Sequence, residues 1–329
     1  PSTANNNFRA CWAVEQANGE TWIFTGNDNG NVYFTDEGSE SIQTWVSKGT
    51  LANGVRRIMF KNYVSGSSIT LAGAIINNTA SSDAFPTFFS VTKVLTIGNY
   101  SPAPTASATF NDLEVDQAND RIYLQDETNR RIYLAPISGS SITTTATLLN
   151  NQIPSNTPVA FSYNQADTIF AVHPTGAISR GVVNNSVSPP TIAWTNQMDS
   201  TRMDLINDIQ YSSAASTYFV CGERGYMAYL VSGVWRRMTT NIIDNLNAIK
   251  LTSSTTGFLA ADNGKIFSFI ISGGWIVTCT EVPTTVSVNL NDILVNGNAL
   301  MAVGDEGTIL FSNNITTTPL VRLNFNSTS

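Results

Sequence analysis

The sequence predicts an all-β fold in which short strands are grouped into repeated units of four. Three observations lead to this prediction. A four-residue phrase recurs along the chain, each copy is followed by two apolar runs separated by a polar corner that contains glycine, and no segment keeps a helical period over about 11 residues. Proline and glycine also interrupt the chain too often for long helices.

The recurring phrase consists of an apolar residue, Asn, usually Asp, and a second apolar residue. Its copies are Phe110-Asn111-Asp112-Leu113, Ile206-Asn207-Asp208-Ile209, Leu246-Asn247-Ala248-Ile249 and Leu290-Asn291-Asp292-Ile293. Neighbouring copies are one or two units apart if a unit has about 40 to 50 residues, a period typical of propeller blades. The phrase therefore marks the same position in successive units.

The paired apolar runs predict β-hairpins with tight corners. They are clearest in "YFVCGERGYMAYL" (218–230), "GFLAADNGKIFSFI" (257–270) and "LMAVGDEGTILFS" (300–312). Glycine suits such corners because a tight hairpin turn places a residue at positive φ, where a Cβ atom is penalised. Gly307, in the last of these runs, is expected to occupy such a position.

A further apolar segment follows each hairpin and often carries tryptophan. Trp45, Trp194, Trp235 and Trp275 occupy similar places in four units. Together with the phrase and the hairpin, this segment gives four strands per unit. We expect these tryptophans to be structural blade residues that pack between units, and the alternative is that they stack against a ligand.

Units of four strands that cannot bury both faces alone are typical of a β-propeller. The sequence predicts one propeller domain over residues 1–329, with seven four-stranded blades at about 8–50, 54–100, 105–150, 157–199, 204–240, 245–283 and 289–326. The second is the least regular, with a longer connection at 77–86. Unit one starts with a first strand and unit seven ends with a fourth, which allows closure by side-chain packing alone but leaves open how the ring closes.

Composition and charge narrow the possible functions. Charged residues are 12% of the chain, about half of the usual share, whereas Asn, Ser and Thr are abundant, which favours an extracellular or virion setting. The net charge is −7, and the arginine pairs at 56–57, 130–131 and 236–237 fall at different points of the repeat, so we expect no basic groove. Nucleic acid is therefore not an expected partner.

The sequence gives little support for a metal site, a disulfide framework, a bound cofactor or a membrane-spanning segment. Cys11, Cys221 and Cys279 are too few and too scattered for a disulfide framework or a zinc site, and we expect small buried thiols. No apolar run approaches about 18 residues, so membrane insertion is not expected. No phosphate-binding glycine loop opens a helix, and no cofactor is expected.

The repeats resemble those of known propellers. "LNDI", "AVGDEGTILFS" and "GGWIV" are similar to the repeats of photosystem II assembly-factor-like propellers, most clearly over residues 204–314, and more distantly to those of Asp-box (BNR) propellers, which include sialidases. The stretch Thr35-Asp36-Glu37-Gly38 with Trp45 resembles a degenerate Asp box with a stretched spacing. The resemblance implies a seven-bladed propeller, and its motifs specify a blade rather than an activity.

A catalytic set does not emerge from the sequence. A sialidase-like enzyme would need an arginine cluster, a nucleophilic tyrosine with a glutamate partner and an acidic acid/base residue, and these cannot be assembled at one end of the ring. The single histidine, His173, precedes Pro174 at a hairpin corner, where a turn role is expected, and no nucleophile elbow occurs. We therefore expect no catalytic residues and no enzymatic activity.

Three aspartates form the one candidate site that the repeats suggest. Asp112, Asp208 and Asp292 share a repeat position, so they would gather at one mouth of the central channel, where they could attract a cation. The alternative is that each caps its own backbone through Asx-type hydrogen bonds. The stretch "GNDNGN" at 26–31 has the oxygen ligands of a calcium loop but lacks the downstream glutamate, so a hairpin turn is expected and no resident metal.

These features favour a non-enzymatic propeller that is a structural or adhesive component of an extracellular or viral assembly, such as a virion decoration, fibre or tail protein. Its partners would be other structural proteins of the assembly, or surface glycans. Two alternatives stay open. One is a carbohydrate-binding lectin with several equivalent sites that stack sugars on aromatic residues. The other is a protein-binding propeller that acts like the assembly factors.

Overall fold

Strands make up nearly all of the regular structure. The computed structural model describes residues 7–15, 21–36, 44–65, 68–77, 83–101, 108–154, 157–198, 205–273, 276–323 and 326–328. Within these residues the helical segments are two short 3₁₀ turns, η1 (Glu223–Gly225) and η2 (Asp262–Gly264). The prediction of an all-β chain is confirmed.

Along the described residues, strands β1–β28 form seven consecutive antiparallel meanders of four, called blades 1 to 7 here. Blades 1 to 3 contain β1 (Phe8–Glu15), β2 (Thr21–Asn27), β3 (Asn31–Thr35), β4 (Thr44–Thr50); β5 (Val55–Ser65), β6 (Ser68–Asn77), β7 (Ala84–Phe89), β8 (Leu95–Ile97); β9 (Phe110–Asp116), β10 (Arg121–Asp126), β11 (Arg131–Pro136) and β12 (Thr147–Leu148). Blades 4 and 5 contain β13 (Ala160–Tyr163), β14 (Thr168–Val172), β15 (Ala177–Asn184), β16 (Thr191–Met198); β17 (Ile206–Ser212), β18 (Thr217–Gly222), β19 (Met227–Val231) and β20 (Val234–Thr240). Blades 6 and 7 contain β21 (Leu246–Leu251), β22 (Thr256–Ala261), β23 (Ile266–Ser272), β24 (Ile276–Val282); β25 (Leu290–Asn296), β26 (Ala299–Gly304), β27 (Thr308–Ser312) and β28 (Val321–Arg322).

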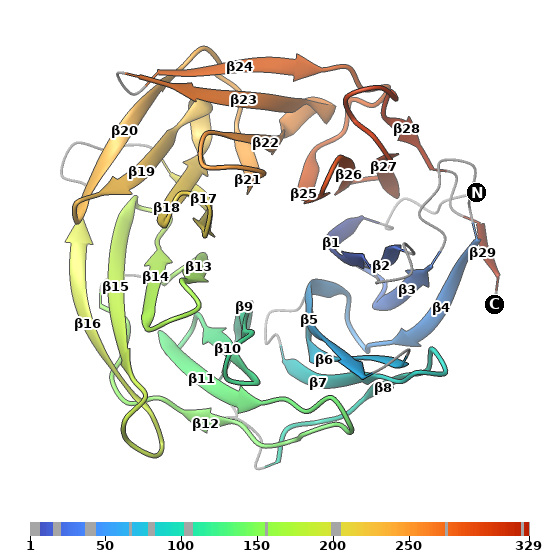
Figure 1. Ribbon diagram of the computed structural model, residues 1–329, viewed down its shortest axis with the longest axis vertical. Coiled ribbons are helices and arrows are strands. Elements are labelled where there is room, and N and C mark those ends of the chain that lie inside the picture. The colour runs from blue at the N-terminus through green and yellow to red at the C-terminus, as the bar shows by residue number, and fades with distance from the viewer. Residues whose placement is uncertain are drawn as a thin grey trace.

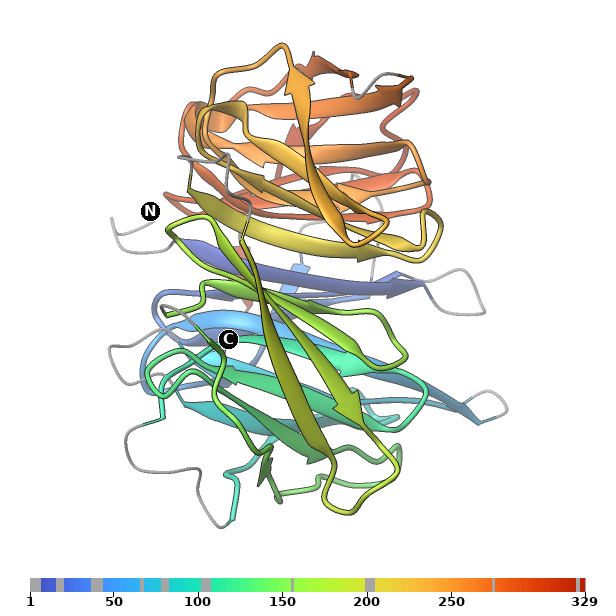
Figure 2. The same ribbon diagram turned by 90° about the vertical axis from the view of Figure 1, so that its left-hand side faces the viewer.

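The blades stand in a ring around a central channel, so the fold is a β-propeller (Figure 1). The first strand of each blade lies at the channel and the fourth lies at the outer rim. Seen from the side, the sheets follow one another around the ring, and each sheet faces the sheets of the two neighbouring blades (Figure 2). This arrangement explains the strand sequences, because second strands such as β18 are buried on both faces and read as continuous apolar runs. The outer strand β24 instead alternates between exposed and buried residues over its first five positions.

The hydrophobic core lies between the blades. Seven clusters of buried apolar side chains occur among the described residues, and each contains residues of two successive blades. Between blades 1 and 2, for example, Phe24 and Phe60 meet with ring centroids 4.9 Å apart. A single blade could not bury both of its faces, so ring closure and folding stability depend on each other.

A strand that the sequence did not predict contributes to ring closure. β29 (Asn326–Thr328) follows blade 7 and pairs in parallel with β4, the outer strand of blade 1. Side-chain packing alone, the form of closure that the sequence allowed, is therefore not what closes the ring. A main-chain ladder at the rim supplements the apolar cluster in which Phe8 and Met301 lie between blades 7 and 1. A second parallel pairing, of β20 with β24, joins the rims of blades 5 and 6.

The hairpin corners have the predicted backbone conformation. Gly307 has a φ of 68° and follows Glu306 at 55°. The corresponding residues of η2, Asn263 and Gly264, have φ values of 59° and 74°. The prediction that glycine at these corners serves a left-handed conformation is confirmed.

The cysteines and the apolar segments behave as ordinary parts of this core. Cys11, Cys221 and Cys279 are buried and free of disulfide bonds. In the part of the chain that the structure describes, no helix has the length and apolar character needed to cross a membrane.

Candidate functional site

A β-bulge recurs at the second position of the inner strands and determines what faces the channel. It occurs in six of the seven blades, as far as the described residues go, and adds one extra residue to the inner strand each time. The extra residues are Arg9, Arg56, Asn111, Asn207, Asn247 and Asn291. Because two residues then oppose one on the neighbouring strand, consecutive side chains gather at the same mouth of the channel.

The asparagines at these bulges join each blade to the next. The side-chain amide of Asn207 donates a hydrogen bond to the carbonyl oxygen of Leu246 at 2.9 Å, and that of Asn247 donates to Leu290 at 2.9 Å. Asn111 donates to the carbonyl oxygen of Pro158 at 2.8 Å, and Asn291 to that of Phe8 at 2.9 Å. The recurring Asn of the sequence phrase is therefore an inter-blade contact.

The predicted aspartates lie beside these asparagines and make two kinds of contact. One carboxylate oxygen accepts a hydrogen bond from the next N–H of the chain, as in Asp292 with Ile293 at 2.9 Å. The other oxygen accepts a hydrogen bond from the inner strand of the following blade. These inter-blade bonds are Phe161 N–H to Asp112 at 2.9 Å, Ile249 N–H to Asp208 at 3.0 Å and Cys11 N–H to Asp292 at 3.1 Å.

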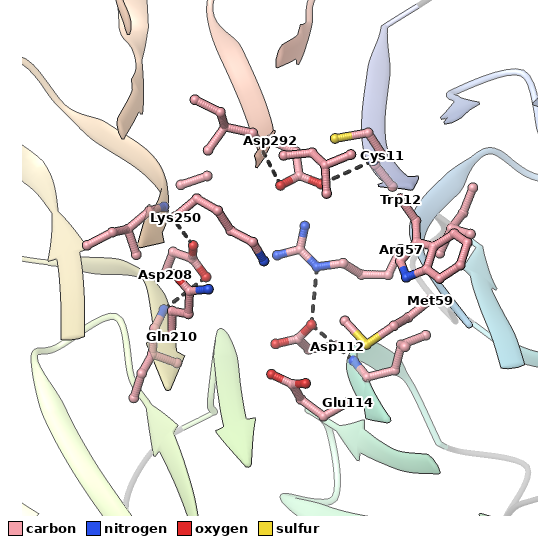
Figure 3. A pocket seen from close by; sticks show the side chains of 18 of the residues that line it. Cys11, Trp12, Arg57, Met59, Asp112, Glu114, Asp208, Gln210, Lys250 and Asp292 are labelled. Carbon is pink, nitrogen blue, oxygen red and sulfur yellow. Dashed lines mark hydrogen bonds and ion pairs between the residues drawn. The ribbon is translucent and has the colours of Figure 1, made fainter. Parts of the chain in front are cut away.

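The three aspartates line one cavity in the channel, and a cation of the chain itself lies among them (Figure 3). The Arg57 Nε donates to the Asp112 carboxylate at 3.1 Å. Burial lowers the pKa of Arg57, but the carboxylates of Asp112, Asp292 and Asp208 raise it more, so its pKa lies above the ordinary value. Among the described residues, no group of three or more His, Cys, Asp and Glu is placed to hold a metal ion. Arg57 thus takes the place that the sequence left open for a cation.

Two carboxyls in this cavity have raised pKa values. Burial raises the pKa of Asp208 to about 6, against the opposing effect of Arg57. Burial, followed by the charge of Asp112, raises the pKa of Glu114 to about 8. Lys250 also lines the cavity, whose volume is about 130 Å³. A space of this size, smaller than the range of about 300 to 1,000 Å³ typical of ligand pockets, is too small for an organic substrate.

The mouth of the channel carries a wider and more open hollow, called the mouth hollow here. Its volume is about 400 Å³, and it is lined by Arg9, Arg56, Arg57, Asn111, Val159 and Asn291. Arg9 and Arg56 form ion pairs with carboxylates that do not themselves line the hollow. Arg9 pairs with Asp28 at 3.2 Å, and Arg56 pairs with Glu127 at 3.7 Å.

The mouth hollow is a feature that sequence reasoning missed. The sequence predicted no basic groove from the three arginine pairs, but Arg56 and Arg57 line this hollow together with Arg9. The bulge explains this, because Arg9 and Arg56 occupy the position that Asn occupies in other blades. An alignment of the repeats by strand rather than by the Asn-Asp phrase would have exposed the equivalence.

The described blade tryptophans lie in the seams between blades. Trp45 on β4 is 1% exposed and packs in the cluster between blades 7 and 1. Trp235 on β20 is 7% exposed and meets Phe170 of blade 4 edge-on, with centroids 5.7 Å apart. Trp194 is half-buried beside the cluster between blades 3 and 4. Trp275 lies outside the described residues.

Other candidate residues serve the fold. His173 is fully buried, with Nε2 3.1 Å from the Ser179 hydroxyl, so it cannot meet a substrate. The stretch 26–31 is the β2–β3 turn, in which the Asn27 side-chain oxygen accepts hydrogen bonds from the N–H groups of Asn29 and Asn31. Glu37 and Gly38 of the Asp-box-like stretch lie outside the described residues.

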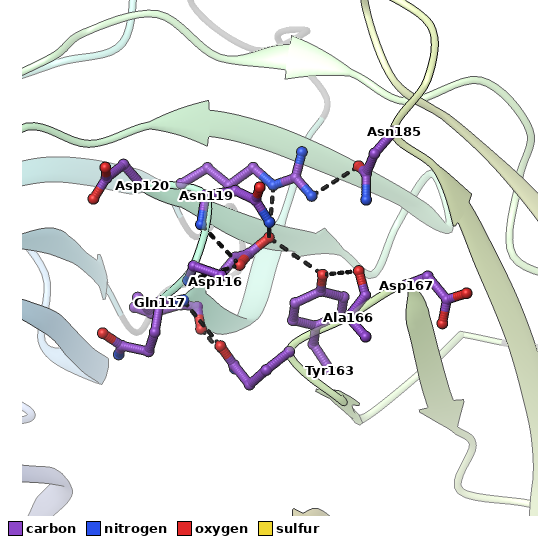
Figure 4. A network of polar contacts seen from close by, with 12 residues as sticks. Asp116, Gln117, Asn119, Asp120, Tyr163, Ala166, Asp167 and Asn185 are labelled. Carbon is purple, nitrogen blue, oxygen red and sulfur yellow. Dashed lines mark hydrogen bonds and ion pairs between the residues drawn. The ribbon is translucent and has the colours of Figure 1, made fainter.

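A second polar network joins blades 3 and 4 at the opposite end of their inner strands, where β9 and β13 end (Figure 4). The Asp116 carboxylate accepts hydrogen bonds from Arg121 Nε at 2.8 Å and from the Tyr163 hydroxyl at 3.2 Å. Arg121 also donates to the Asn185 side chain at 2.8 Å. Because Asp116 is fully buried and its partners come from both blades, the network fixes their relative position.

Comparisons with known proteins show the fold and no family. No family model matches the sequence, and no curated protein matches it. Among solved structures, YCF48 from Cyanidioschyzon merolae is similar, with a TM-score of 0.67 and 13% identity over 97% of this chain and 98% of that one. Raptor from Chaetomium thermophilum is similar with a TM-score of 0.65 and 10% identity over 99% of this chain, which spans 29% of the Raptor chain. The chain therefore has a β-propeller fold similar to that of these structures.

Proposed function

We propose that this protein is a non-enzymatic binding propeller that takes part in a larger extracellular or viral assembly. The mouth hollow is the observation that supports the proposal most. Arg9, Arg56 and Arg57 present guanidinium groups to it, and among the described residues no carboxylate lines it. Guanidinium groups bind carboxylates in two-pronged geometry, so an acidic side chain or chain end of a neighbouring protein would fit.

The rigidity of the surroundings supports the same proposal. Arg9 is held by both Asp28 and Asp305, and Arg57 by Asp112, so these arginines need little ordering when a partner binds. The cavity among the three aspartates has a volume of about 130 Å³, too small for an organic substrate. His173 is buried and belongs to no catalytic set. A preformed surface with fixed donors suits binding more than chemistry.

Two variants test the binding site. Arg56→Gln removes one guanidinium whose ion pair with Glu127 is long, so the fold should tolerate it. Arg236→Gln, at an exposed position on β20, is the matched control. Native source material is fractionated on a density gradient and probed with an antibody to the chain. We expect the unaltered protein and Arg236→Gln to bind the particle fraction, and Arg56→Gln to bind it at least about tenfold more weakly.

The location of the protein is a separate part of the proposal. Regularly spaced antibody label on a particle or filament under the electron microscope would support a structural component of an assembly. Label found only on monomeric soluble protein would contradict this role. It would favour the alternative of a protein-binding propeller that acts like an assembly factor.

A lectin with several equivalent sites receives less support from the structure. That alternative depended on recurring aromatic residues, but Trp45 and Trp235 are buried between blades and offer no face to a sugar. Binding of multivalent glycans through equivalent sites would still be visible as a strong multivalent signal on a glycan array. Its absence would reject the repeated-site lectin.

A further inference from the structure

A pocket unrelated to the mouth hollow lies in the seam between blades 5 and 6. Its volume is about 650 Å³, within the range of about 300 to 1,000 Å³ typical of ligand pockets. Three hairpin turns surround it: the β17–β18 turn, the β19–β20 turn and the β21–β22 turn. The parallel pairing of β20 with β24 joins the two blades at the rim, so the pocket is formed before any ligand arrives.

The floor of this seam pocket is aromatic and aliphatic. The rings of Phe219 and Tyr229 are stacked, with an angle of 12° between their planes and 5.7 Å between their centroids. Ile271 lines the pocket from blade 6, on the opposite side of the seam. Phe219 is buried in the core between the two blades, whereas Tyr229 is half-buried. The pair therefore extends the apolar core to the surface and presents an aromatic group there.

The rim of the seam pocket consists of hydroxyl groups. Ser232, Ser254 and Thr255 are exposed, and their side chains make no hydrogen bond to other described residues. Thr217 differs, because its hydroxyl donates to the Leu230 carbonyl within the blade. Each free hydroxyl can both donate and accept a hydrogen bond, as the hydroxyls of a sugar do. Their turns are fixed, with Ser232 at a φ of 51°.

The lining of the seam pocket is uncharged as far as the structure describes the chain. The described residues around it include no Asp, Glu, Lys, Arg or His. A charged ligand would lose its hydration there without gaining an opposite charge. A purely apolar ligand would cover the rim hydroxyls and leave them without partners. A ring with an apolar C–H face and several neutral hydroxyls satisfies both the floor and the rim.

From these features we propose that the seam pocket binds a neutral pyranose sugar, at one site on the ring. The C–H face of the sugar lies against the Tyr229 ring, and its hydroxyls bond to Ser232, Ser254 and Thr255. This site is distinct from the mouth hollow, and it is a single pocket rather than the set of equivalent sites that the repeats suggested. Its ligand class is uncharged hexose or N-acetylhexosamine.

Saturation-transfer NMR tests the proposal with the methyl glycosides of glucose, galactose, mannose and N-acetylglucosamine, each at about 10 mM because single sugar sites are weak. We expect transfer to at least one of them. Methyl sialoside, which carries a carboxylate, serves as the charged comparison and should show none at this pocket. Saturation transfer to none of the four neutral glycosides would overturn the proposal. Saturation transfer to the sialoside would also overturn it, if the sialoside and the neutral glycosides displace one another.

Variants locate the binding. Thr255→Trp places a large side chain in the pocket from an exposed turn, where the fold should accept it, and should weaken binding at least about tenfold. Ser140→Trp, on an exposed turn of blade 3, is the matched control and should bind as the unaltered protein does. Unchanged binding by Thr255→Trp would place the sugar elsewhere and overturn the assignment. Arg56→Gln should bind sugar normally, so failure of the mouth hollow proposal would leave this one standing.

Discussion

The carboxylate of Asp292 accepts a hydrogen bond from the backbone N–H of Cys11 at 3.1 Å, which joins two residues 281 positions apart. This bond connects the inner strand of blade 7 to that of blade 1. The neighbouring Asn291 donates to the carbonyl oxygen of Phe8 at 2.9 Å. The ring is thus closed at the channel by the same contacts that join its internal blades.

Asp292→Ala should weaken this closure. The Cys11 N–H would lose its acceptor in a buried place, and we expect a loss of about 1 to 3 kcal/mol in the free energy of unfolding. Urea denaturation followed by tryptophan fluorescence measures it. Asp83→Ala, at an exposed position, should change stability by less than about 0.5 kcal/mol. Equal stability of the two variants would show that the bond from Cys11 to Asp292 contributes nothing measurable to closure.

Arg57→Gln should destabilise the channel in a pH-dependent way. Three aspartates would lose the cation between them, at an expected cost of about 2 to 3 kcal/mol at pH 7. The loss should shrink near pH 4, because protonated carboxyls no longer need a counter-ion. Arg236→Gln is the control at both pH values. A loss that is the same at pH 4 and pH 7 would mean that Arg57 acts through packing instead of charge.

Glu114 should make the protein less stable as the pH rises. Its pKa in the folded chain, about 8, lies above the unfolded value, so the folded state binds the extra proton. The resulting stability is present at low pH and is lost between about pH 4.5 and pH 8, up to a bound of about 5 kcal/mol. Asp208, with a pKa of about 6, contributes in the same direction over a narrower window.

Glu114→Gln isolates that contribution. The variant keeps the shape and cannot ionise, so its stability should fall less than that of the unaltered protein between pH 5 and pH 9. Thermal unfolding across this range gives the comparison. Parallel stability curves for the two proteins would show that Glu114 stays ionised in the channel.

Gly307→Val should strain the β26–β27 corner. The residue has a φ of 68°, which a β-branched side chain strongly disfavours, so we expect a loss of at least about 1 kcal/mol. Gly273→Val is the matched control, since a Cβ there meets no atom within 4 Å and the φ is not in the left-handed region. Equal melting temperatures for the two variants would contradict the turn conformation.

Much of the blade could be predicted from the sequence because its determinants are local. Alternating apolar residues reflect half-buried strands such as β24, and continuous apolar runs reflect buried strands such as β18. Gly307 reflects a turn that needs positive φ. The Asn-Asp phrase marks the start of an inner strand for a partly local reason, since Asp112, Asp208 and Asp292 each bind the next N–H of the chain. These features repeat, so each copy reinforced the interpretation of the others.

The sequence by itself therefore determined the strands, their grouping in fours and the propeller class, because hydrophobic period and turn chemistry act within a few residues. The tertiary structure decided the rest. Only the closed ring brings Arg57 among aspartates from three other blades, sets Arg9 beside Arg56 at the mouth, and pairs β29 with β4. Arg9, Arg56 and Arg57 hold repeat positions that Asn and Asp hold in other blades, but their residue types depart from the Asn-Asp phrase, so the phrase did not reveal these contacts. Their physical basis is the complementarity of charge and backbone across seams, which exists only once the blades stand in a circle.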